Sequence, residues 1–582
     1  MQYPRLRIHL GGVGKDVSYC DKVTFTVRNM FRDMLMKEKP GLTASKARRV
    51  GKVQMGNRHK RGSREDSSSK SVSSPEKEDT SGMDANKKEL LSQKSIARFF
   101  YENCVDFSTV DCPIFREMMT LSGVQMGVKF PSSQDLNGWM LQEALQEVED
   151  NVKKIKDLWK VTGCSILLDA WVDEKGRDLV AFVADCPAGP VYLKSFDVSH
   201  IKSNDTALMS LVDGLVEEVG VHNVVQIIAY STSGWVGELG KSFVSNNVNV
   251  FWSVSVSHCF ELMLVRIVEM YSFEDIVDKV NKITEFINSN PLVSKLVRDQ
   301  SHGIDKTVSS SEFEFVKPYL SLESIFMAKN DLAAMFASSD WSKEEGKTMT
   351  KLMNDFSFWE TVERVVKCTS PLIRGLLLFT SANNQHVGYI YDIMDGIKES
   401  IAKEFNHKEK CYKPSWDVID DVWNTHLHSP LHVTGYFLNP GAFYSGDFHC
   451  DPEVTTGFIS SLARMVKESH ILVKVSTQLE MYRLGKGCFN EASEADEISE
   501  VSPAEWWGQK ASQYPELQSF AIKVLSQTCE GASRYKLKRN LAEKLLLTEG
   551  RSQFEQHQLE KLAFVHYNLH LQSCKAKLSG KQ

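Results

Sequence analysis

Residues 163–199 read GCSILLDAWVDEKGRDLVAFVADCPAGPVYLKSFDVS, a stretch with three short apolar runs rich in β-branched residues. Runs of this length, bounded by Gly, Pro and Asp, are typical of β-strands. An amphipathic helical pattern, ALMSLVDGLVEEVG, follows at 207–220, and another strand-like run, VVQIIAYSTS, follows at 224–233. Three strands, a crossover helix and a further strand predict a mixed sheet packed against helices, so we expect an α/β fold.

Helical periodicity surrounds this sheet region. Apolar residues recur at spacings of three and four in residues 95–160, and the chain after about residue 271 is mainly helical in pattern up to about 470. The longest apolar stretches, such as SILLDAW and LIRGLLLF, are far shorter than the roughly 20 residues of a membrane span, and MQYPRLRIHL does not have the pattern of a signal peptide. We expect a soluble intracellular protein with no membrane partner.

Overall composition excludes a polycationic protein. The chain of 582 residues carries 69 Lys and Arg against 75 Asp and Glu, so binding to nucleic acid would have to come from a local basic segment. Its 12 cysteines are scattered with no C-x-x-C pair, which favours free thiols in a reducing compartment over a disulfide framework.

A local basic segment does occur near the N-terminus. Residues 37–64 contain ten Lys or Arg and a single acidic residue, Glu38. The serine-rich stretch at 63–82 has almost nothing apolar to bury, which predicts a disordered linker. The cluster is either a solvated tail, or a nuclear import signal or phosphate-binding arm. The candidate nucleic-acid-binding residues are Lys46, Arg48, Arg49, Lys52, Arg58, Lys60, Arg61 and Arg64.

Two candidate metal ligands precede this arm. His9 is followed after ten residues by Cys20, a spacing that could form the second half of a zinc site. Structural zinc needs four ligands, and the cysteine pair that would supply the first half is absent. His9 and Cys20 are therefore an incomplete zinc site or structural bystanders.

Asp169 leaves the first strand of the predicted sheet, and Tyr230 stands where the 224–229 strand ends. Carboxylates at strand ends can hold catalytic metal ions, but such sites need several carboxylates together. On its own, Asp169 is either a turn or capping residue or one ligand of a metal site.

A C-terminal block carries unusual aromatic surface. Residues 502–529 read SPAEWWGQKASQYPELQSFAIKVLSQTC, with more aromatic area than one short helix buries alone. Core packing is one explanation, and a buried partner surface is the other, since Trp and Tyr are enriched at interface centres. The candidate dimerisation residues are Trp506, Trp507, Tyr514, Pro515, Leu517, Phe520 and Leu525.

The strings at 163–199, 223–236 (NVVQIIAYSTSGWV), 251–264 (FWSVSVSHCFELML), 431–440 (LHVTGYFLNP) and 502–529 resemble plant proteins derived from hAT-superfamily transposases. The resemblance implies a BED zinc finger, a ribonuclease H-like core interrupted by a large helical insertion, and dimerisation through the C-terminal block. The expected organisation is a partial finger at 1–36, a basic and serine-rich disordered arm at 37–94, a helical segment at 95–160, core at 161–290, the insertion at 291–470, and the remaining core with the dimerisation region at 471–582.

The same resemblance implies that the metal-binding catalytic triad is incomplete in this chain. Active relatives hold divalent metal with a triad of two aspartates and a glutamate, of which Asp169 matches the first. Tyr230 takes the second position, and without a gap the third falls on Tyr535, with Glu530 nearby but out of register. The family's C-x-x-H element reads SVSH, which keeps His258 and has Ser255 in place of the cysteine. A neutral phenol cannot replace a metal-binding carboxylate, so no catalytic metal is expected.

We therefore expect a domesticated, catalytically inactive hAT transposase-like protein of the nucleus that binds DNA and forms homodimers, or heterodimers with related proteins. Zinc would be a cofactor only if other ligands complete the site of His9 and Cys20. The alternatives are an active metal-dependent transposase, which would need the lost carboxylates, and a dimerisation partner that does not bind DNA.

Overall fold

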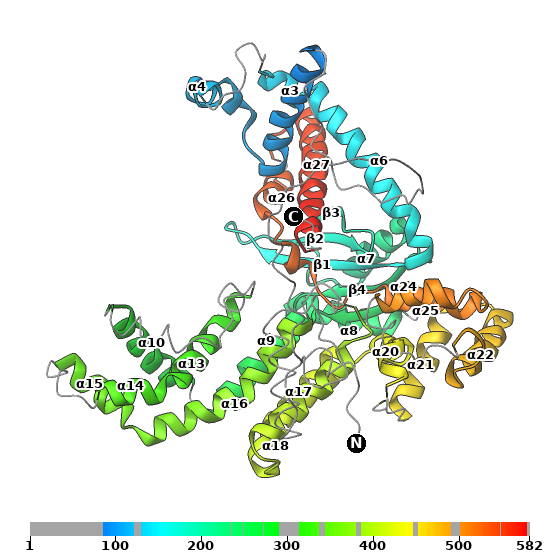
Figure 1. Cartoon of the computed structure of the whole chain (residues 1–582). Helices are drawn as coiled ribbons and strands as arrows, with labels where there is room; N and C mark the ends of the chain where they lie inside the picture. Colours follow the sequence, from blue (N-terminus) through cyan, green and yellow to red (C-terminus); the bar gives the residue numbers. More distant parts are fainter. Residues whose placement is uncertain are drawn as a thin grey trace, which may run out of the picture. The chain divides into compact units, whose positions relative to one another are not determined.

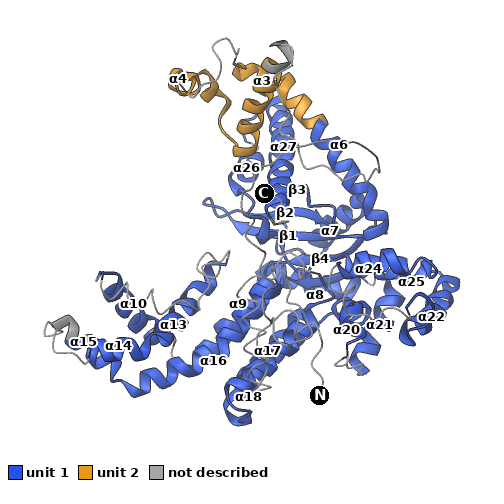
Figure 2. Ribbon diagram, in the orientation of Figure 1, with its two compact units in different colours: residues 1–4, 147–582 blue, residues 5–146 orange. Residues whose placement is uncertain are grey.

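In the computed structural model of the chain, the described residues are 85–121, 130–232, 234–247, 249–271, 273–289, 291, 313–336, 344–379, 386–445, 448, 452–489, 501–547 and 549–578. They divide into two compact units, one up to residue 146 and one from residue 147 onwards (Figure 2).

The first unit is helical, as the periodicity predicts. Its elements are α3 (Ala85–Asn103), the 3-10 turn η2 (Phe107–Asp111), α4 (Pro113–Leu121), α5 (Ser133–Asn137) and the beginning of α6 (Trp139–Thr162). Ser132 and Asp135 form a capping box at the start of α5, and the Tyr101 hydroxyl donates to the Leu136 carbonyl oxygen at 2.7 Å. These contacts satisfy backbone groups that helix ends leave unpaired.

The second unit contains a five-stranded mixed sheet, which confirms the expected α/β class (Figure 1). Its strands are β1 (Cys164–Val172), β2 (Asp178–Asp185), β3 (Val191–Asp197), β4 (Val224–Ala229) and β5 (Phe251–Val254), in the order β3-β2-β1-β4-β5. β1, β2 and β3 form an antiparallel meander, whereas β4 and β5 run parallel to their neighbours. Parallel strands need crossover connections, and α7 (Asp205–Val219), before β4, and α8 (Gly234–Asn246), before β5, lie in these connections.

C-terminal helices pack against one face of this sheet. Side chains alternate between the two faces of a strand, so Leu167, Asp169 and Trp171 share one face of β1. Leu167 and Trp171 lie in a buried cluster with residues of α26 (Arg539–Leu545) and α27 (Gln553–Leu578). Asp169 is therefore on the face that the C-terminal helices approach.

A buried polar network joins the sheet to the end of the C-terminal block. The Ser165 hydroxyl on β1 donates to Gln527 Oε1 at 3.0 Å. Gln226 on β4 donates from Nε2 to Ser165 Oγ at 3.0 Å and to the Thr528 carbonyl oxygen at 2.7 Å. Buried polar groups are costly unless they are paired, so this network fixes residues 527–528 against the sheet.

Helices dominate the chain after β5. They are α9 (Val256–Glu269), α10 (Phe273–Ser289), η3 (Glu314–Val316), α13 (Lys317–Met327), α14 (Lys329–Phe336), α15 (Glu344–Met353), α16 (Phe356–Phe379), α17 (Ile390–Glu404), α18 (Glu409–Val422), the π-helical turn η4 (Trp423–Leu427), α19 (Pro430–Leu438), α20 (Pro440–Phe443), α21 (Pro452–Met465) and α22 (Ser469–Arg483). The predicted mainly helical character is confirmed for the described residues of this region.

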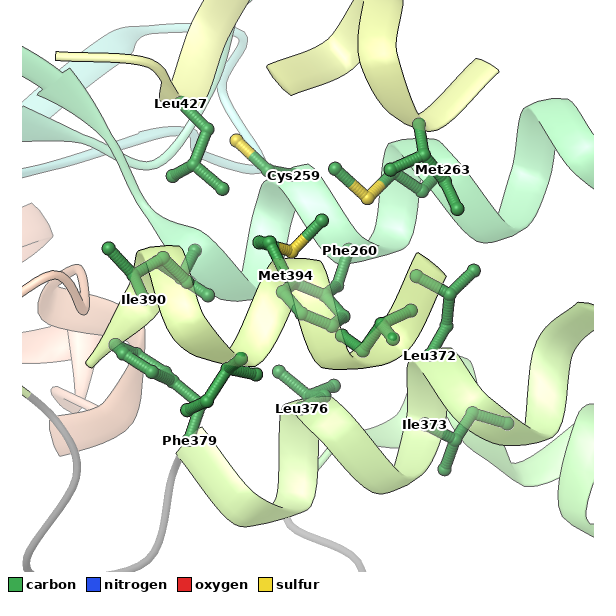
Figure 3. Close-up of a cluster of buried hydrophobic side chains, with 14 of the residues drawn as sticks. Cys259, Phe260, Met263, Leu372, Ile373, Leu376, Phe379, Ile390, Met394 and Leu427 are labelled. Carbon is green, nitrogen blue, oxygen red and sulfur yellow. The ribbon is translucent and has the colours of Figure 1, made fainter. Parts of the chain in front are cut away.

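Close packing joins α9, α16 and α17. Phe260 and Met263 of α9, Leu376 of α16 and Met394 of α17 point toward one another in a buried cluster (Figure 3). α16 approaches α17 at Gly375, where a Cβ atom would lie only 2.2 Å from Ile397 Cδ1. A larger residue at 375 would therefore force the Ile397 side chain to move.

The C-terminal block folds as α24 (Pro503–Lys510) and α25 (Pro515–Leu525), followed by the 3-10 turn η6 (Ala532–Tyr535). Ser502 and Glu505 form a capping box at the start of α24, with Pro503 in its first turn. The indole of Trp507 is buried and donates to the Leu438 carbonyl oxygen at 2.8 Å, while its ring lies 4.9 Å from that of Tyr482. The block therefore packs on the preceding helices of its own chain.

Candidate functional site

Asp169 and Tyr230 lie side by side where β1 and β4 run in parallel. The register pairs Leu167 with Ile228 and Leu168 with Ala229, so the next residues along the two strands are Asp169 and Tyr230. Both side chains line a pocket of about 290 Å³, together with Ser533, Lys536, Leu537 and Arg539. The structure thus places these two strand-end residues in one pocket, whereas their family-derived roles stay a prediction.

Asp169 is paired with a cation of the same chain. The Asp169 side chain is 6% exposed, and its Oδ1 accepts a hydrogen bond from Arg539 Nη2 at 3.1 Å. Burial raises the pKa of Asp169, and the adjacent Arg539 charge lowers it only in part. The guanidinium of Arg539 also lies 5.1 Å from the ring of Trp171, which holds the arginine over the end of the strand.

Tyr230 contributes a neutral phenol to this pocket. Burial, followed by the negative charges of Glu261 and Asp169, raises the pKa of Tyr230. Its ring lies 5.4 Å from the imidazole of His258, which contacts Glu261 at 3.4 Å and the Thr232 hydroxyl at 3.4 Å. A phenol that stays protonated is a weak ligand for a divalent cation, so Tyr230 cannot act as the second carboxylate would.

Tyr535, the residue expected at the third acidic position, binds a different carboxylate. Its hydroxyl donates to Asp185 Oδ1 at 2.8 Å, and Arg534 Nη2 donates to Asp185 Oδ2 at 2.8 Å. Asp185 pairs with Ser165 of β1, four residues before Asp169, which corresponds to roughly 13 Å along the strand. Asp185 was missed by sequence reasoning, although its position at the end of a strand-like run was a usable signal.

Glu530 is buried beneath the start of α9. Its Oε2 accepts hydrogen bonds from Ser257 Oγ at 3.0 Å and Ser255 Oγ at 3.3 Å, and its Oε1 has no hydrogen-bond partner among the described residues. Burial raises the pKa of Glu530 to about 7, against the lowering effects of Ser257 and Arg534. Glu530 is held by serines and does not line the pocket beside Asp169.

This donor set does not fit a divalent catalytic metal. The pocket offers one carboxylate, and that carboxylate faces an arginine that would repel a metal ion. Across the described residues, no three His, Cys, Asp or Glu side chains are grouped so that they could hold a metal ion.

The N-terminal candidates lie outside the described residues. These are the zinc-site residues His9 and Cys20 and the arm residues Lys46, Arg48, Arg49, Lys52, Arg58, Lys60, Arg61 and Arg64. Predictions about zinc and about DNA binding by the arm therefore stay predictions.

The predicted dimerisation residues divide by exposure. Trp506, Trp507, Leu517, Phe520 and Leu525 are buried in the chain's own core, whereas Tyr514 is half-buried and Pro515 is exposed. The burial of the first five favours core packing, the alternative explanation of this block. A direct partner contact would have to use exposed residues around them.

Two regions of the chain match known family models. Residues 131–283 match a domain of unknown function (DUF659), and residues 479–569 match the hAT family C-terminal dimerisation region. The first match covers all five strands, and the second covers α24 to most of α27. No curated protein matches the chain.

Together these matches support a hAT transposase-like protein that carries a dimerisation region. Within the part of the chain that the structure describes, no helix combines the length and apolar character needed to cross a membrane.

Proposed function

We propose that this chain is a domesticated hAT transposase-like protein that binds DNA in the nucleus, dimerises, and performs no metal-dependent strand cleavage. The pairing of Asp169 with Arg539 beside the neutral Tyr230 carries this proposal, because it replaces a metal-binding carboxylate cluster with an internal ion pair. The strand order β3-β2-β1-β4-β5, with an antiparallel meander followed by parallel strands, supports a ribonuclease H-like core. Dimerisation is supported by the family match at 479–569.

The basic arm is the part of the chain that would bind DNA, through contacts of its Lys and Arg side chains with phosphates. If five or six of its cations meet phosphates, affinity should fall by roughly a hundredfold or more between low and physiological salt. Contacts of this kind position a protein on a duplex without reading its sequence. A dimer would bring two arms together and raise the apparent affinity through effective concentration.

The test is a binding titration of the purified full chain with a pool of random duplexes at several salt concentrations. Replacing Arg58, Lys60, Arg61 and Arg64 with Ala should weaken binding to all duplexes equally and flatten the salt slope. Tight, salt-insensitive binding to one sequence that survives these replacements would overturn the proposed role of the arm. A lack of binding by the unmodified chain would favour the second candidate, a dimerisation partner without DNA binding, for which the dimerisation match is the supporting observation.

A further inference from the structure

The pocket beside Asp169 is cationic, a property that the lost catalytic role does not explain. Its lining residues include Lys536 and Arg539 against the single carboxylate of Asp169, so the charge of the lining is +1. Tyr230 and Ser533 add neutral hydroxyl groups, and Leu537 adds an apolar wall. A volume of about 290 Å³ is close to the lower end of ligand-sized pockets.

Arg539 has donors beyond those it uses internally. A guanidinium carries five N–H donors in a planar fork, and one of these bonds Asp169. The arginine side chain is 45% exposed, so the outer part of the fork faces solvent at the pocket. The cation–π contact with Trp171, 5.1 Å from the guanidinium carbon to the ring centroid, and the hydrogen bond to Asp169 restrict the arginine side chain before any ligand arrives, which reduces the entropy lost on binding.

Lys536 approaches the pocket from a fixed turn. It follows η6 with φ 47° and ψ 51°, and its side chain is exposed. Ser533 lies at the other end of the same turn, since the Lys536 backbone N–H donates to the Ser533 carbonyl oxygen at 3.0 Å. The turn therefore presents a hydroxyl and an ammonium group to the pocket that Arg539 borders.

We infer that this pocket binds a phosphate group without a divalent cation, with Arg539 and Lys536 as the anion-binding side chains. Arginine forks match tetrahedral oxyanions through paired hydrogen bonds, and lysine adds a point charge. A phosphodiester carries one negative charge, which would balance the lining charge of +1. This inference concerns the sheet pocket, and it stands independently of the N-terminal arm.

The test uses the full chain with Arg58, Lys60, Arg61 and Arg64 replaced by Ala, so that the arm does not contribute. The probes are inorganic phosphate and a short oligothymidine strand, both in EDTA. The local readout is the rate of lysine acetylation at Lys536, measured by mass spectrometry. Lys538 is the matched control, because it is exposed two residues away and does not line the pocket.

The expected result is that a probe slows acetylation of Lys536 and leaves Lys538 unchanged. Lys536→Gln should weaken oligonucleotide binding by about tenfold, the effect of losing one hydrogen bond to a charged group, whereas Lys538→Gln should not. Protection by the oligonucleotide alone identifies a phosphodiester ligand, and equal protection by both probes identifies the phosphate group itself. Both outcomes support the site.

The inference is overturned if neither probe protects Lys536 more than Lys538 in EDTA, if protection appears only when Mg²⁺ replaces EDTA, or if the two lysine variants bind equally. DNA binding by the chain with an intact arm is measured separately. A pocket that does not bind the probes, in a chain whose intact arm still binds DNA, would therefore overturn this inference alone and leave the proposed function standing.

Discussion

Arg539 Nη2 lies 3.1 Å from Asp169 Oδ1, although the two residues are 370 positions apart in the chain. The pair joins β1 to the first residue of α26 and lies at the pocket that Tyr230 also lines. A buried carboxylate needs a compensating charge, and here a side chain of the protein supplies it.

This pairing predicts a measurable coupling. Arg539→Gln should lower the free energy of unfolding by about 1–2 kcal/mol at neutral pH, a discounted value because the arginine is half-exposed. In a double-mutant cycle with Asp169→Asn, the loss should largely disappear, since the amide carries no charge that needs a partner. Additive effects of the two substitutions would show that the pair does not interact.

The pH dependence of the same variant has a defined sign. Burial raises the pKa of Asp169 in the folded chain, and removing Arg539 raises this pKa further. Below the unfolded pKa the aspartate is protonated in both states, so Arg539→Gln should cost least in acid. The penalty should grow as the pH rises toward neutrality, which urea unfolding at several pH values would measure.

Glu530 should make the chain less stable at alkaline pH. Its pKa is raised from 4.5 to about 7 in the folded state, so the folded chain holds the proton more tightly than the unfolded chain. The resulting stability is present below the unfolded pKa and is lost as the pH rises through the folded pKa, a change of about 3 kcal/mol. Glu530→Gln should remove this dependence and be more stable than the parent at pH 8. A variant with the same pH profile as the parent would contradict the assignment.

Replacing Trp507 should lower the free energy of unfolding of the chain itself, and any effect on dimerisation should follow from that loss of stability. The side chain is 0% exposed and its indole N–H is paired, so Trp507→Ala should cost about 3–5 kcal/mol through the cavity that it leaves. Phe554→Ala is the aromatic control within the matched dimerisation region, since Phe554 is 69% exposed, and it should change the free energy of unfolding by less than about 0.5 kcal/mol. Dissociation of a Trp507→Ala dimer with no loss of monomer stability would place this tryptophan at the interface instead.

The zinc content of the chain tests the N-terminal prediction. With only His9 and Cys20 as ligands, the purified chain should carry well under one tightly bound zinc ion. Metal analysis that finds one zinc per chain, lost in Cys20→Ser, would show that other ligands complete the site.

The sheet could be predicted from the sequence because β1, β2 and β4 are buried and read as continuous apolar runs. The sequence also placed Asp169 and Tyr230 where strand-like runs end, but the parallel pairing of β1 with β4 that brings them together is seen only in the structure. Arg539 could not be predicted as the partner of Asp169, because nothing local to 169 indicates which distant cation reaches it.

The location of the C-terminal aromatic residues, in the core or at an interface, also could not be decided from the sequence. Trp506 and Trp507 look equally suited to an interface or a core by composition. Only the packing of Phe489 and Tyr482 against them shows that they fill the interior of this chain.

Cleavage of a labelled DNA duplex by the purified full chain in Mg²⁺ or Mn²⁺ is the most direct test of the proposed loss of chemistry. The internal pairing of Asp169 with Arg539 and the neutral Tyr230 predict no cleavage or strand transfer, with the same background for the parent chain and for Asp169→Ala. Metal-dependent cleavage by the parent that disappears in Asp169→Ala would contradict it.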